Sequence, residues 1–384
     1  STRKESSEAS DVYKRQGVSH SKFKATNRST VEMGYDVGMD ALKKSNLTLE
    51  DIELIVVTDT MFETNGEHQR HTPALYAELF QTDIPIIRVE AACAGGSAAF
   101  YTANKMSGKN VLVIGSDKLK SGTTLDITEE LAYAGEHYDE QGEGLNFPAQ
   151  NALIANQFMK LRDISIEDLH LIAKKNYDFA KTNPYAFFYK KDITLEAIKK
   201  SPVISSPLQL HHCSVSVDGA CAVVLSSEKT DVELVGSALI TSPMSFFARE
   251  NPLVLEGVRK AAKIAYTQAN IHPEDIDVAE VHDAFSTLEI MAYEDLGFCK
   301  EGEGKYMIQN GETHLNGRIP INTSGGLKAK GHPVSTTGLA QIVWLTKQLR
   351  GECAENQVND PKIALAHNIG GVGATSCIHI LKKV

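Results

Sequence analysis

The sequence EDIELIVVTD at residues 50–59 returns, with the same turn and a similar apolar run, as EDIDVAEVHD at residues 274–283. In both copies a Glu-Asp-Ile turn leads into a short apolar strand pattern that ends on an aspartate. A pattern typical of an amphipathic helix precedes each turn. A repeat of this kind indicates that one α/β unit occurs twice in the chain.

Two further pairs of elements repeat in the same order. The glycine-rich turn at 93–96 corresponds to the turn at 322–326, and the apolar strand at 111–115 corresponds to the strand at 363–366. One such match arises easily between any two strand-helix-strand patterns, whereas three matches in one order do not. We therefore predict a tandem duplication.

Short apolar runs alternate with helical patterns along the whole chain. Ser29 and Glu32 have the spacing of a capping box, which opens a helix that runs to about Lys44. The other predicted elements are strands at 54–58, 84–89, 221–226, 232–237 and 277–281, and helices at 96–106, 149–160, 338–349 and after the cap Ser165. This alternation predicts an α/β fold with mainly parallel sheets.

The alternation loosens between residues 118 and 207, where charged, aromatic and turn-forming residues predominate. We interpret the stretch 118–207 as a subdomain inserted into the first copy. The predicted organisation is an N-terminal half at 17–230, which contains the insertion, and a C-terminal half at 231–384. The polar residues 1–16 carry no strand pattern, and we expect them to be poorly ordered.

Composition excludes several classes of function. The 384 residues are 42% hydrophobic, which is enough for a large core, and the net charge of -10 argues against nucleic acid or an anionic membrane as the main partner. Six cysteines without a Cys-x-x-Cys pair indicate reduced thiols rather than disulfides or a zinc site. Because no apolar run reaches about 20 residues and no signal peptide is recognisable, we expect a cytoplasmic protein.

Cys93 lies in VEAACAGGSAAF, where a predicted strand ends and a helix of small residues begins. A thiol in this place faces the positive end of a helix, which favours the reactive thiolate. Backbone N–H groups at such a turn can also stabilise an oxyanion. An isolated cysteine is more often a small buried apolar residue, so the nucleophile hypothesis needs support from elsewhere in the chain.

Three histidines supply that support. His332 lies in the glycine-bounded loop NTSGGLKAKGHPVSTTG, His282 follows the strand at 277–281, and His367 follows the strand at 363–366. Ligands of open α/β sheets bind beyond the carboxyl ends of the strands. An imidazole held there can deprotonate a thiol and then stabilise an oxyanion. We therefore predict one shared site for Cys93 and the three histidines.

Other candidates are weaker. His211 and His212 with Cys213 could suggest a metal site, but no further ligand follows at a suitable spacing, so we interpret them as part of a surface loop. The lysines of this chain that could meet a nucleotide phosphate, or could simply be solvated, are Lys118, Lys120, Lys328 and Lys330.

The motifs AACAGG, HDAF, GGLKAKGHP and HNIGGVG together resemble the thiolase superfamily, in particular the sterol-carrier-type and archaeal acetoacetyl-CoA thiolases. The resemblance spans roughly residue 17 to the C-terminus. It implies a duplicated, five-layered α-β-α-β-α fold with a loop domain inserted in the first half, and it implies no bound cofactor, because coenzyme A is a substrate.

The resemblance also implies roles for individual residues. Cys93 matches the acylated nucleophile, and His332 of the Gly-His-Pro motif matches the histidine that activates it. His282 takes the place of an asparagine that holds a water at the oxyanion hole. We further assign substrate binding to Gly371 in one glycine-rich turn and to Ser324 and Gly325 in the other.

The sequence departs from the family at two places. His367 stands where many thiolases carry a second, acid/base cysteine, and Ala284 stands where the sterol-carrier type carries its cysteine, so a histidine must take over proton transfer. Either His367 or His332 could do so. Ser335 and Thr336 replace the usual Gly and Ala after Gly-His-Pro, which changes the surroundings of the acyl or pantetheine arm.

The resemblance implies an acetyl-CoA C-acetyltransferase that works by ping-pong Claisen condensation and thiolysis. The alternatives are a longer-chain 3-ketoacyl-CoA thiolase, a polyketide-type C-acyltransferase, and a non-catalytic acyl-CoA-binding or scaffold subunit. A homodimer or a dimer of dimers is expected. Archaeal relatives also suggest a hydroxymethylglutaryl-CoA synthase and a small zinc-bearing OB-fold protein as partners.

Overall fold

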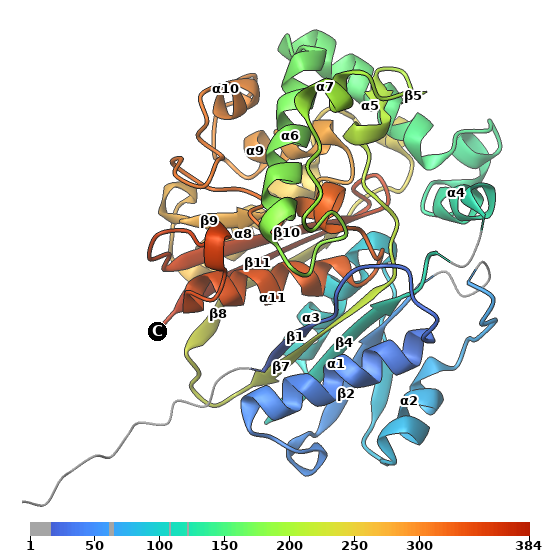
Figure 1. The fold of residues 1–384 in the computed structure, drawn as a ribbon, viewed down its shortest axis with the longest axis vertical. Coiled ribbons are helices and arrows are strands. Elements are labelled where there is room, and N and C mark those ends of the chain that lie inside the picture. The colour runs from blue at the N-terminus through green and yellow to red at the C-terminus, as the bar shows by residue number, and fades with distance from the viewer. Residues whose placement is uncertain (1–16, 61–64, 107–108, 121–122) are drawn as a thin grey trace, which may run out of the picture.

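A computed structural model describes residues 17–60, 65–106, 109–120 and 123–384. Two β-sheets lie one above the other, with helices between them and on their outer faces (Figure 1). The expectation for residues 1–16 concerns a segment outside the described residues.

The first sheet has five strands from the first part of the chain. In spatial order they are β1 (Val18–His20), β7 (Gly219–Ser226), β4 (Asn110–Asp117), β2 (Leu54–Thr58) and β3 (Ile86–Arg88). β4, β2 and β3 run parallel, while β7 is antiparallel to both β4 and β1. The strand predicted at 54–58 is confirmed with the same bounds.

The second sheet has four strands from the second part of the chain. In spatial order they are β8 (Val232–Thr241), β11 (Thr375–Lys383), β10 (Ile363–Gly370) and β9 (Val278–Glu280). β9 and β10 are parallel, and β11 is antiparallel to both β10 and β8. The prediction of mainly parallel sheets is therefore wrong, because each sheet combines parallel strands with antiparallel ones.

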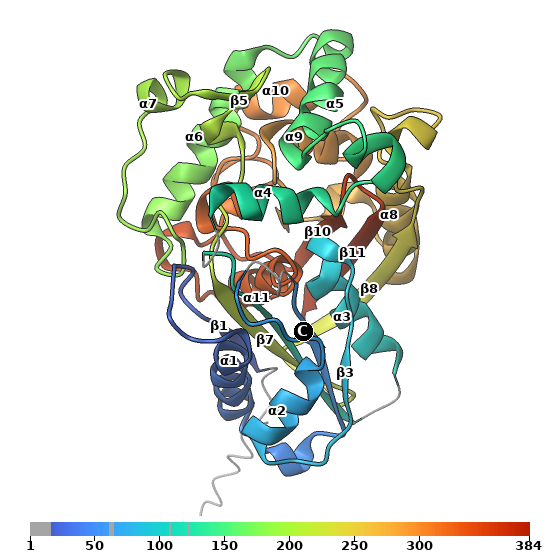
Figure 2. The ribbon, with the colours of Figure 1, turned by 90° about the vertical axis from the view of Figure 1, so that its right-hand side faces the viewer.

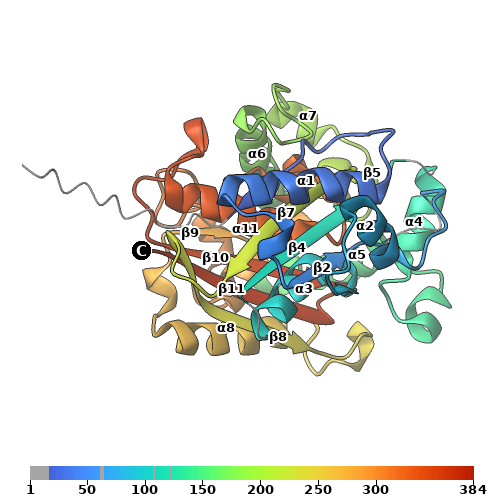
Figure 3. The same cartoon turned by 90° about the horizontal axis from the view of Figure 1, so that it is seen from below.

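The helices form layers around the sheets. α1 (Thr30–Ser45) and α2 (Thr72–Phe80) pack on the first sheet, and α8 (Glu256–Ala269) packs on the second, so that α1 and α8 lie on opposite sides of the molecule (Figure 3). α3 (Gly95–Lys105) and α11 (Thr337–Arg350) lie between the sheets and contact strands of both (Figure 2).

The strands of the first sheet are apolar on both faces because both faces are covered. In β2, Ile55 and Val57 pack towards α1, whereas Val56 on the other face joins the cluster that contains Phe100 of α3 and Leu339 of α11. A continuous apolar run is therefore the correct signal for this strand.

The remaining helices gather at one end of the molecule, beyond the second sheet. They are α4 (Thr124–Ala132), α5 (Phe147–Arg162), α6 (Ile166–Thr182), α7 (Leu195–Lys199), α9 (Ser286–Asp295) and α10 (Gly304–Gln309), and they are accompanied by a hairpin of β5 (Val203–Ser205) and β6 (Leu208–Gln209). α6 packs against both α9 and α10 (Figure 1). The predicted caps at Ser29 and Ser165 are confirmed, since both residues form capping boxes.

The two similar ten-residue stretches have the same local structure. α1 and α8 both end at a left-handed asparagine, Asn46 and Asn270. A short helical turn follows each, and its aspartate accepts from the backbone N–H three residues earlier, with Asp51 bonding Thr48 at 2.9 Å and Asp275 bonding His272 at 2.8 Å. A buried strand, β2 or β9, then begins.

His367 differs from its prediction. β10 runs to Gly370, so His367 lies within the strand rather than after it. The strand extends because β11 pairs with it residue by residue from Ile363 to Gly370, and the turn to β11 comes only after Gly370. Within the part of the chain that the structure describes, no helix is long and apolar enough to cross a membrane.

Candidate active site

Cys93 lies in the short turn Ala92–Ala94, between β3 and the first residue of α3, as the sequence predicts. Its side chain is 1% exposed. Burial raises the pKa of the thiol to about 12, and the Asp117 carboxylate acts in the same direction, whereas the backbone N–H groups of Gly371 and of Cys93 itself oppose the shift. Burial thus outweighs the helix terminus, which by itself favours the thiolate, and the thiol needs a base.

A cavity of about 190 Å³ adjoins the thiol. It is lined by Thr60, Glu90, Ala92, Cys93, Glu130, Leu131, Tyr133, Ala134 and Val334. Val334 follows the Gly-His-Pro motif, and Leu131 and Tyr133 belong to α4 and the turn after it. Residues far apart in the sequence thus meet around Cys93.

His332 is held in one tautomer. Its Nδ1 lies 2.7 Å from Thr337 Oγ1, and that hydroxyl donates its only proton to the carbonyl oxygen of Pro333 at 3.0 Å. The hydroxyl can therefore only accept from the imidazole, so Nδ1 carries the proton of neutral His332. Its Nε2 consequently presents a lone pair, as a general base must.

His282 and His367 are held in the opposite tautomer. The Asn368 side-chain amide donates to His282 Nδ1 at 2.9 Å, and the backbone N–H of His282 donates to His367 Nδ1 at 3.4 Å. Because both Nδ1 atoms accept, both Nε2 atoms carry the proton. These two side chains are hydrogen-bond donors.

The three imidazoles form one cluster. The rings of His282 and His332 lie 5.5 Å apart, edge to face, and within the described part of the chain the Nε2 atoms of His282, His332 and His367 have no hydrogen-bond partner. Burial lowers the pKa of His332 and of His367 to about 3, and it lowers the pKa of His282 well below its ordinary value. All three are therefore neutral at pH 7.

Gly370 and Gly371 link this cluster to the thiol. Gly371 directs its backbone N–H to the Cys93 sulfur, and a side chain at Gly370 would lie 2.4 Å from the carbonyl oxygen of Ala91. β10, which carries His367, thus ends directly against the turn that carries Cys93. Cys93 and the histidine cluster therefore lie on neighbouring segments, although none of the three histidines is among the residues that line the cavity beside the thiol. A nucleophile, a base and N–H donors are the groups that acyl transfer needs.

Comparisons with known proteins identify the family of the chain. Residues 240–383 match the family model described as thiolase, C-terminal domain-like. The chain is 35% identical over 378 residues to the acetyl-CoA acetyltransferase of Methanothermobacter thermautotrophicus, covering 96% of this chain and 98% of that protein. The chain belongs to the thiolase superfamily. It is an acyltransferase enzyme of that family.

Two further thiolase relatives widen the comparison. Sterol carrier protein 2 of Bos taurus is 32% identical over 384 residues, which cover 93% of this thiolase and 70% of that protein. The solved structure of the "Ltp2-ChsH2(DUF35) aldolase" has a TM-score of 0.81 and 25% identity, with 96% of each chain covered. The family therefore includes members named for different reactions.

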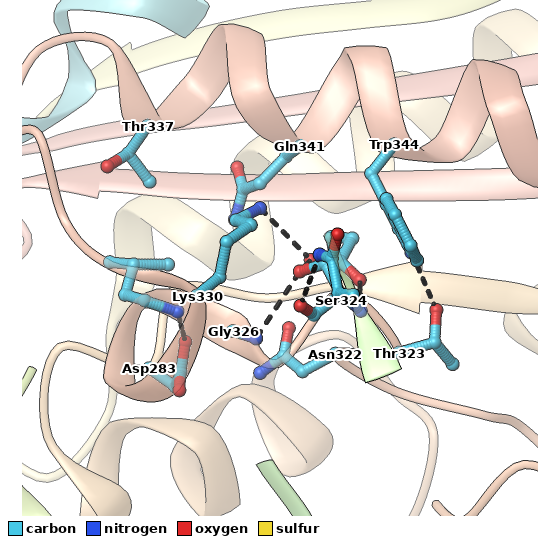
Figure 4. Close-up of polar contacts among 12 residues, drawn as sticks. Asp283, Asn322, Thr323, Ser324, Gly326, Lys330, Thr337, Gln341 and Trp344 are labelled. Atoms are coloured by element: carbon cyan, nitrogen blue, oxygen red, sulfur yellow. Dashed lines mark hydrogen bonds and ion pairs between the residues drawn. The ribbon is translucent and has the colours of Figure 1, made fainter. Parts of the chain in front are cut away.

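Neither Ser324 nor Gly325 of this thiolase is among the residues that line the thiol cavity. Ser324 lies in a buried polar network (Figure 4). The backbone N–H of Ser324 donates to Glu280 at 3.0 Å, its hydroxyl donates to the same carboxylate, and Lys330 Nζ lies 3.8 Å from that carboxylate. A side chain at Gly325, whose φ is +99°, would meet Ala180 of α6 at 2.7 Å. Both residues hold the loop that leads to His332.

The weaker sequence candidates have structural contacts. His212 is fully buried and its Nδ1 accepts from the backbone of Gln209, so the surface-loop prediction is wrong for it, because the turn Leu210–His212 packs against α6. His211 bonds the Tyr177 hydroxyl at 2.8 Å. Lys328 is buried and donates to the carbonyl oxygen of His212, so it is not a solvated lysine.

Sequence reasoning missed Thr337 and Asn368, which set the tautomers. Their positions carried a usable signal, because Thr337 follows His332 by five residues at the first turn of α11, and Asn368 follows His367 directly. A polar residue beside a candidate base is a reason to look for an orienting hydrogen bond.

Proposed function

We propose that this thiolase is an acetyl-CoA C-acetyltransferase of the acetoacetyl-CoA type, which works through an acyl thioester on Cys93. The tautomer of His332 is the observation that carries the proposal, because it leaves a free lone pair on Nε2, and the buried thiol of Cys93 needs a base to ionise. The identity to an archaeal acetyl-CoA acetyltransferase over 96% of the chain supports the choice of acetyl-CoA.

In the first half-reaction, His332 Nε2 takes the proton of the Cys93 thiol, and the thiolate attacks the thioester carbonyl of acetyl-CoA. The N–H groups of Gly371 and Cys93, which bond the Cys93 sulfur, can stabilise the oxyanion that forms beside it. The bond from carbon to the coenzyme A sulfur then breaks. The leaving thiolate takes the proton back from His332, so that acetyl-Cys93 and coenzyme A are the products.

In the second half-reaction, the α-proton of another acetyl-CoA moves to a base. His332 suits this role, since its Nε2 lone pair is free, whereas the Nε2–H groups of His282 and His367 suit donation to the developing enolate oxygen. The carbanion attacks acetyl-Cys93, and the bond between carbon and the Cys93 sulfur breaks. Acetoacetyl-CoA leaves, and the Cys93 thiolate receives the proton from His332.

Intact-protein mass spectrometry after mixing with acetyl-CoA tests the proposal. The expected result is one acetyl adduct on the wild-type chain and none on Cys93→Ala, with Cys353→Ala as a matched control that removes another buried thiol. No adduct on the wild type, despite measurable binding of coenzyme A, would overturn the proposal. A partner-dependent or non-catalytic acyl-CoA protein would then remain.

Two observations favour other acyl substrates or another reaction. The cavity beside Cys93 measures about 190 Å³, which leaves room for a longer acyl chain or a polyketide-type acceptor. The similarity to the Ltp2-ChsH2(DUF35) aldolase favours carbon-carbon cleavage without an acyl-enzyme. Higher activity on 3-ketohexanoyl-CoA than on acetoacetyl-CoA would favour a longer-chain thiolase. Carbon-carbon cleavage that survives Cys93→Ala would favour the aldolase-type reaction.

We also propose the partners and the domain plan. The Ltp2-ChsH2(DUF35) structure supports a DUF35-type protein, which corresponds to the expected zinc-bearing OB-fold partner, while a hydroxymethylglutaryl-CoA synthase and a homodimer rest on family resemblance. The two sheets have similar strand orders. This similarity supports a division into halves at 17–230 and 231–384, with five layers and an insertion at 118–207. Purification of the chain alone from its native host would contradict the partner proposals.

A further inference from the structure

Asp117 ends β4 in the middle of the first sheet and is fully buried. Its carboxylate accepts hydrogen bonds from five donors on two segments, and the one proton of Ser335 Oγ is shared between its two oxygens. The donors are Thr60 N (2.9 Å), Thr60 Oγ1 (3.0 Å), Ser335 Oγ (2.9 and 2.8 Å to the two oxygens), Thr336 N (2.8 Å) and Thr336 Oγ1 (2.7 Å). Charge-assisted bonds of this kind are stronger than bonds between neutral groups, so the two segments are held firmly.

Both segments adjoin the site. Thr60 follows β2 and lines the cavity beside Cys93, as does Val334, which directly precedes Ser335. Thr336 directly precedes Thr337, whose hydroxyl fixes the tautomer of His332. One carboxylate therefore fixes a wall of the cavity and the segment that orients the base.

The segment also contacts the start of α3, which carries the nucleophile. The backbone N–H of Gly96 donates to the carbonyl oxygen of Ser335 at 2.6 Å. A side chain at Gly95 would meet Ser335 Cβ at 2.8 Å, so the two backbones touch at this point. A shift of Ser335 would change the position of the His332 segment relative to the turn of Cys93.

We propose that Asp117 is a positioning residue for the Cys93–His332 pair and acts through Ser335 and Thr336; this rests on the proposed function. Ser335 and Thr336 are the residues after the Gly-His-Pro motif at which this chain departs from the family pattern. Their hydroxyls are two of the five donors to the carboxylate. Glycine and alanine at these positions would have no hydroxyl, so they could not make these hydrogen bonds between the loop and the carboxylate.

The test compares Thr336→Val and Ser335→Ala with Thr346→Val. Thr346 lies on α11 and is fully buried, and within the described residues its hydroxyl has no hydrogen-bond partner, so it controls for loss of a buried hydroxyl. The readouts are the rate of Cys93 acetylation by acetyl-CoA in rapid-quench mass spectrometry and the dissociation constant of coenzyme A. We expect about a 10-fold slower acetylation in the two test variants, unchanged affinity within twofold, and no change in the control.

A second comparison separates positioning from general damage to the fold. If Thr336 acts through His332, Thr336→Val slows acetylation of Cys93 when it is the only substitution. It should cause no further loss of acetylation rate in a chain that already carries His332→Ala. Equal losses in both backgrounds, or no loss in a folded Thr336→Val variant, would overturn the proposal. If the wild type forms no acetyl adduct, the proposed function fails. The same four variants are then compared by the rate at which iodoacetamide alkylates Cys93. A loss that disappears in the His332→Ala background supports the role of Asp117, and equal losses in both backgrounds contradict it.

Discussion

Thr337 Oγ1 accepts a hydrogen bond from His332 Nδ1 at 2.7 Å while donating its own proton to the carbonyl oxygen of Pro333. This arrangement makes Thr337 the residue that decides which nitrogen of the imidazole is basic. Thr337→Val should remove the acceptor and let the proton move to Nε2, which would block the base. We expect kcat to fall by about 10- to 100-fold with little change in KM, because general base catalysis contributes on the order of 10²–10⁴-fold.

Thr337→Ser is the matched control, because it keeps the hydroxyl and should retain most of the activity. The measurement is steady-state condensation of acetyl-CoA at saturating and limiting substrate. A Val variant as active as the Ser variant would contradict the assigned tautomer.

Asn368 has the corresponding role for His282. Its amide donates to His282 Nδ1 at 2.9 Å, so Asn368→Leu should allow the proton to leave Nε2 and remove one donor from the site. Loss of an oxyanion donor typically costs about 10²–10³-fold in kcat. We expect this loss in the condensation step, measured by single-turnover reaction of preformed acetyl-Cys93 with a second acetyl-CoA.

Acetylation of Cys93 should fall much less in Asn368→Leu, because the proposed oxyanion donors of that step are backbone groups of Gly371 and Cys93. Equal losses in both half-reactions would mean that Asn368 supports the whole site rather than His282 alone.

The pKa of Cys93 predicts an unusual pH profile. Burial raises this pKa from 9.0 to about 12, so without a base the thiolate fraction should rise tenfold for each pH unit over the whole range below 12. In His332→Ala, the alkylation rate of Cys93 by iodoacetamide should therefore rise from pH 7 to pH 10 without a plateau. Peptide mapping by mass spectrometry measures the rate, and a plateau near pH 9 would contradict the shift.

Much of the fold could be predicted from the sequence, because its signals are local. Apolar runs covered on both faces gave β2 its correct bounds, and the capping boxes at Ser29 and Ser165 marked the starts of α1 and α6. The sequence also placed Cys93 and His282 at the ends of predicted strands. These features depend on hydrogen bonds and burial within a few residues of each other.

Features that depend on distant partners could not be predicted in this way. The extension of β10 past His367 comes from pairing with β11, and the high pKa of Cys93 comes from burial beneath α4 and the loop after His332. The five donors to Asp117 lie 57 to 219 positions away from it in the sequence. No local pattern reports such contacts.

A buried ion pair joins α6 to α9. Lys175 of α6 lies against Glu289 of α9, both fully buried, and also donates to the carbonyl oxygen of Ile321 at 2.8 Å. Lys175→Met should leave the carboxylate buried and unpaired, at a cost of about 3–5 kcal/mol. Lys181→Met, also on α6, breaks an exposed pair with Asp192 and should cost about 0–1 kcal/mol. Urea unfolding measures both, and similar losses would contradict the assignment.

The contact between α11 and α3 affects the site, because the segment of His332 leads into α11 and the turn of Cys93 leads into α3. A side chain at Gly338 would lie 2.4 Å from the backbone nitrogen and from the hydroxyl of Ser97. Ser97 belongs to the first turn of α3, so no methyl group fits at Gly338 without separating the two helices. Gly338→Ala should therefore destabilise the fold by about 1–3 kcal/mol. It should also slow acetylation of Cys93 about 10-fold or more at a temperature where the variant is folded, because a displacement of about 1 Å already costs on the order of 10²-fold. Thermal unfolding and rapid-quench mass spectrometry measure the two effects. A variant with wild-type stability and a wild-type acetylation rate would show that α3 and α11 can move apart without disturbing the site. That result would contradict the claim that this contact keeps Cys93 and His332 in position.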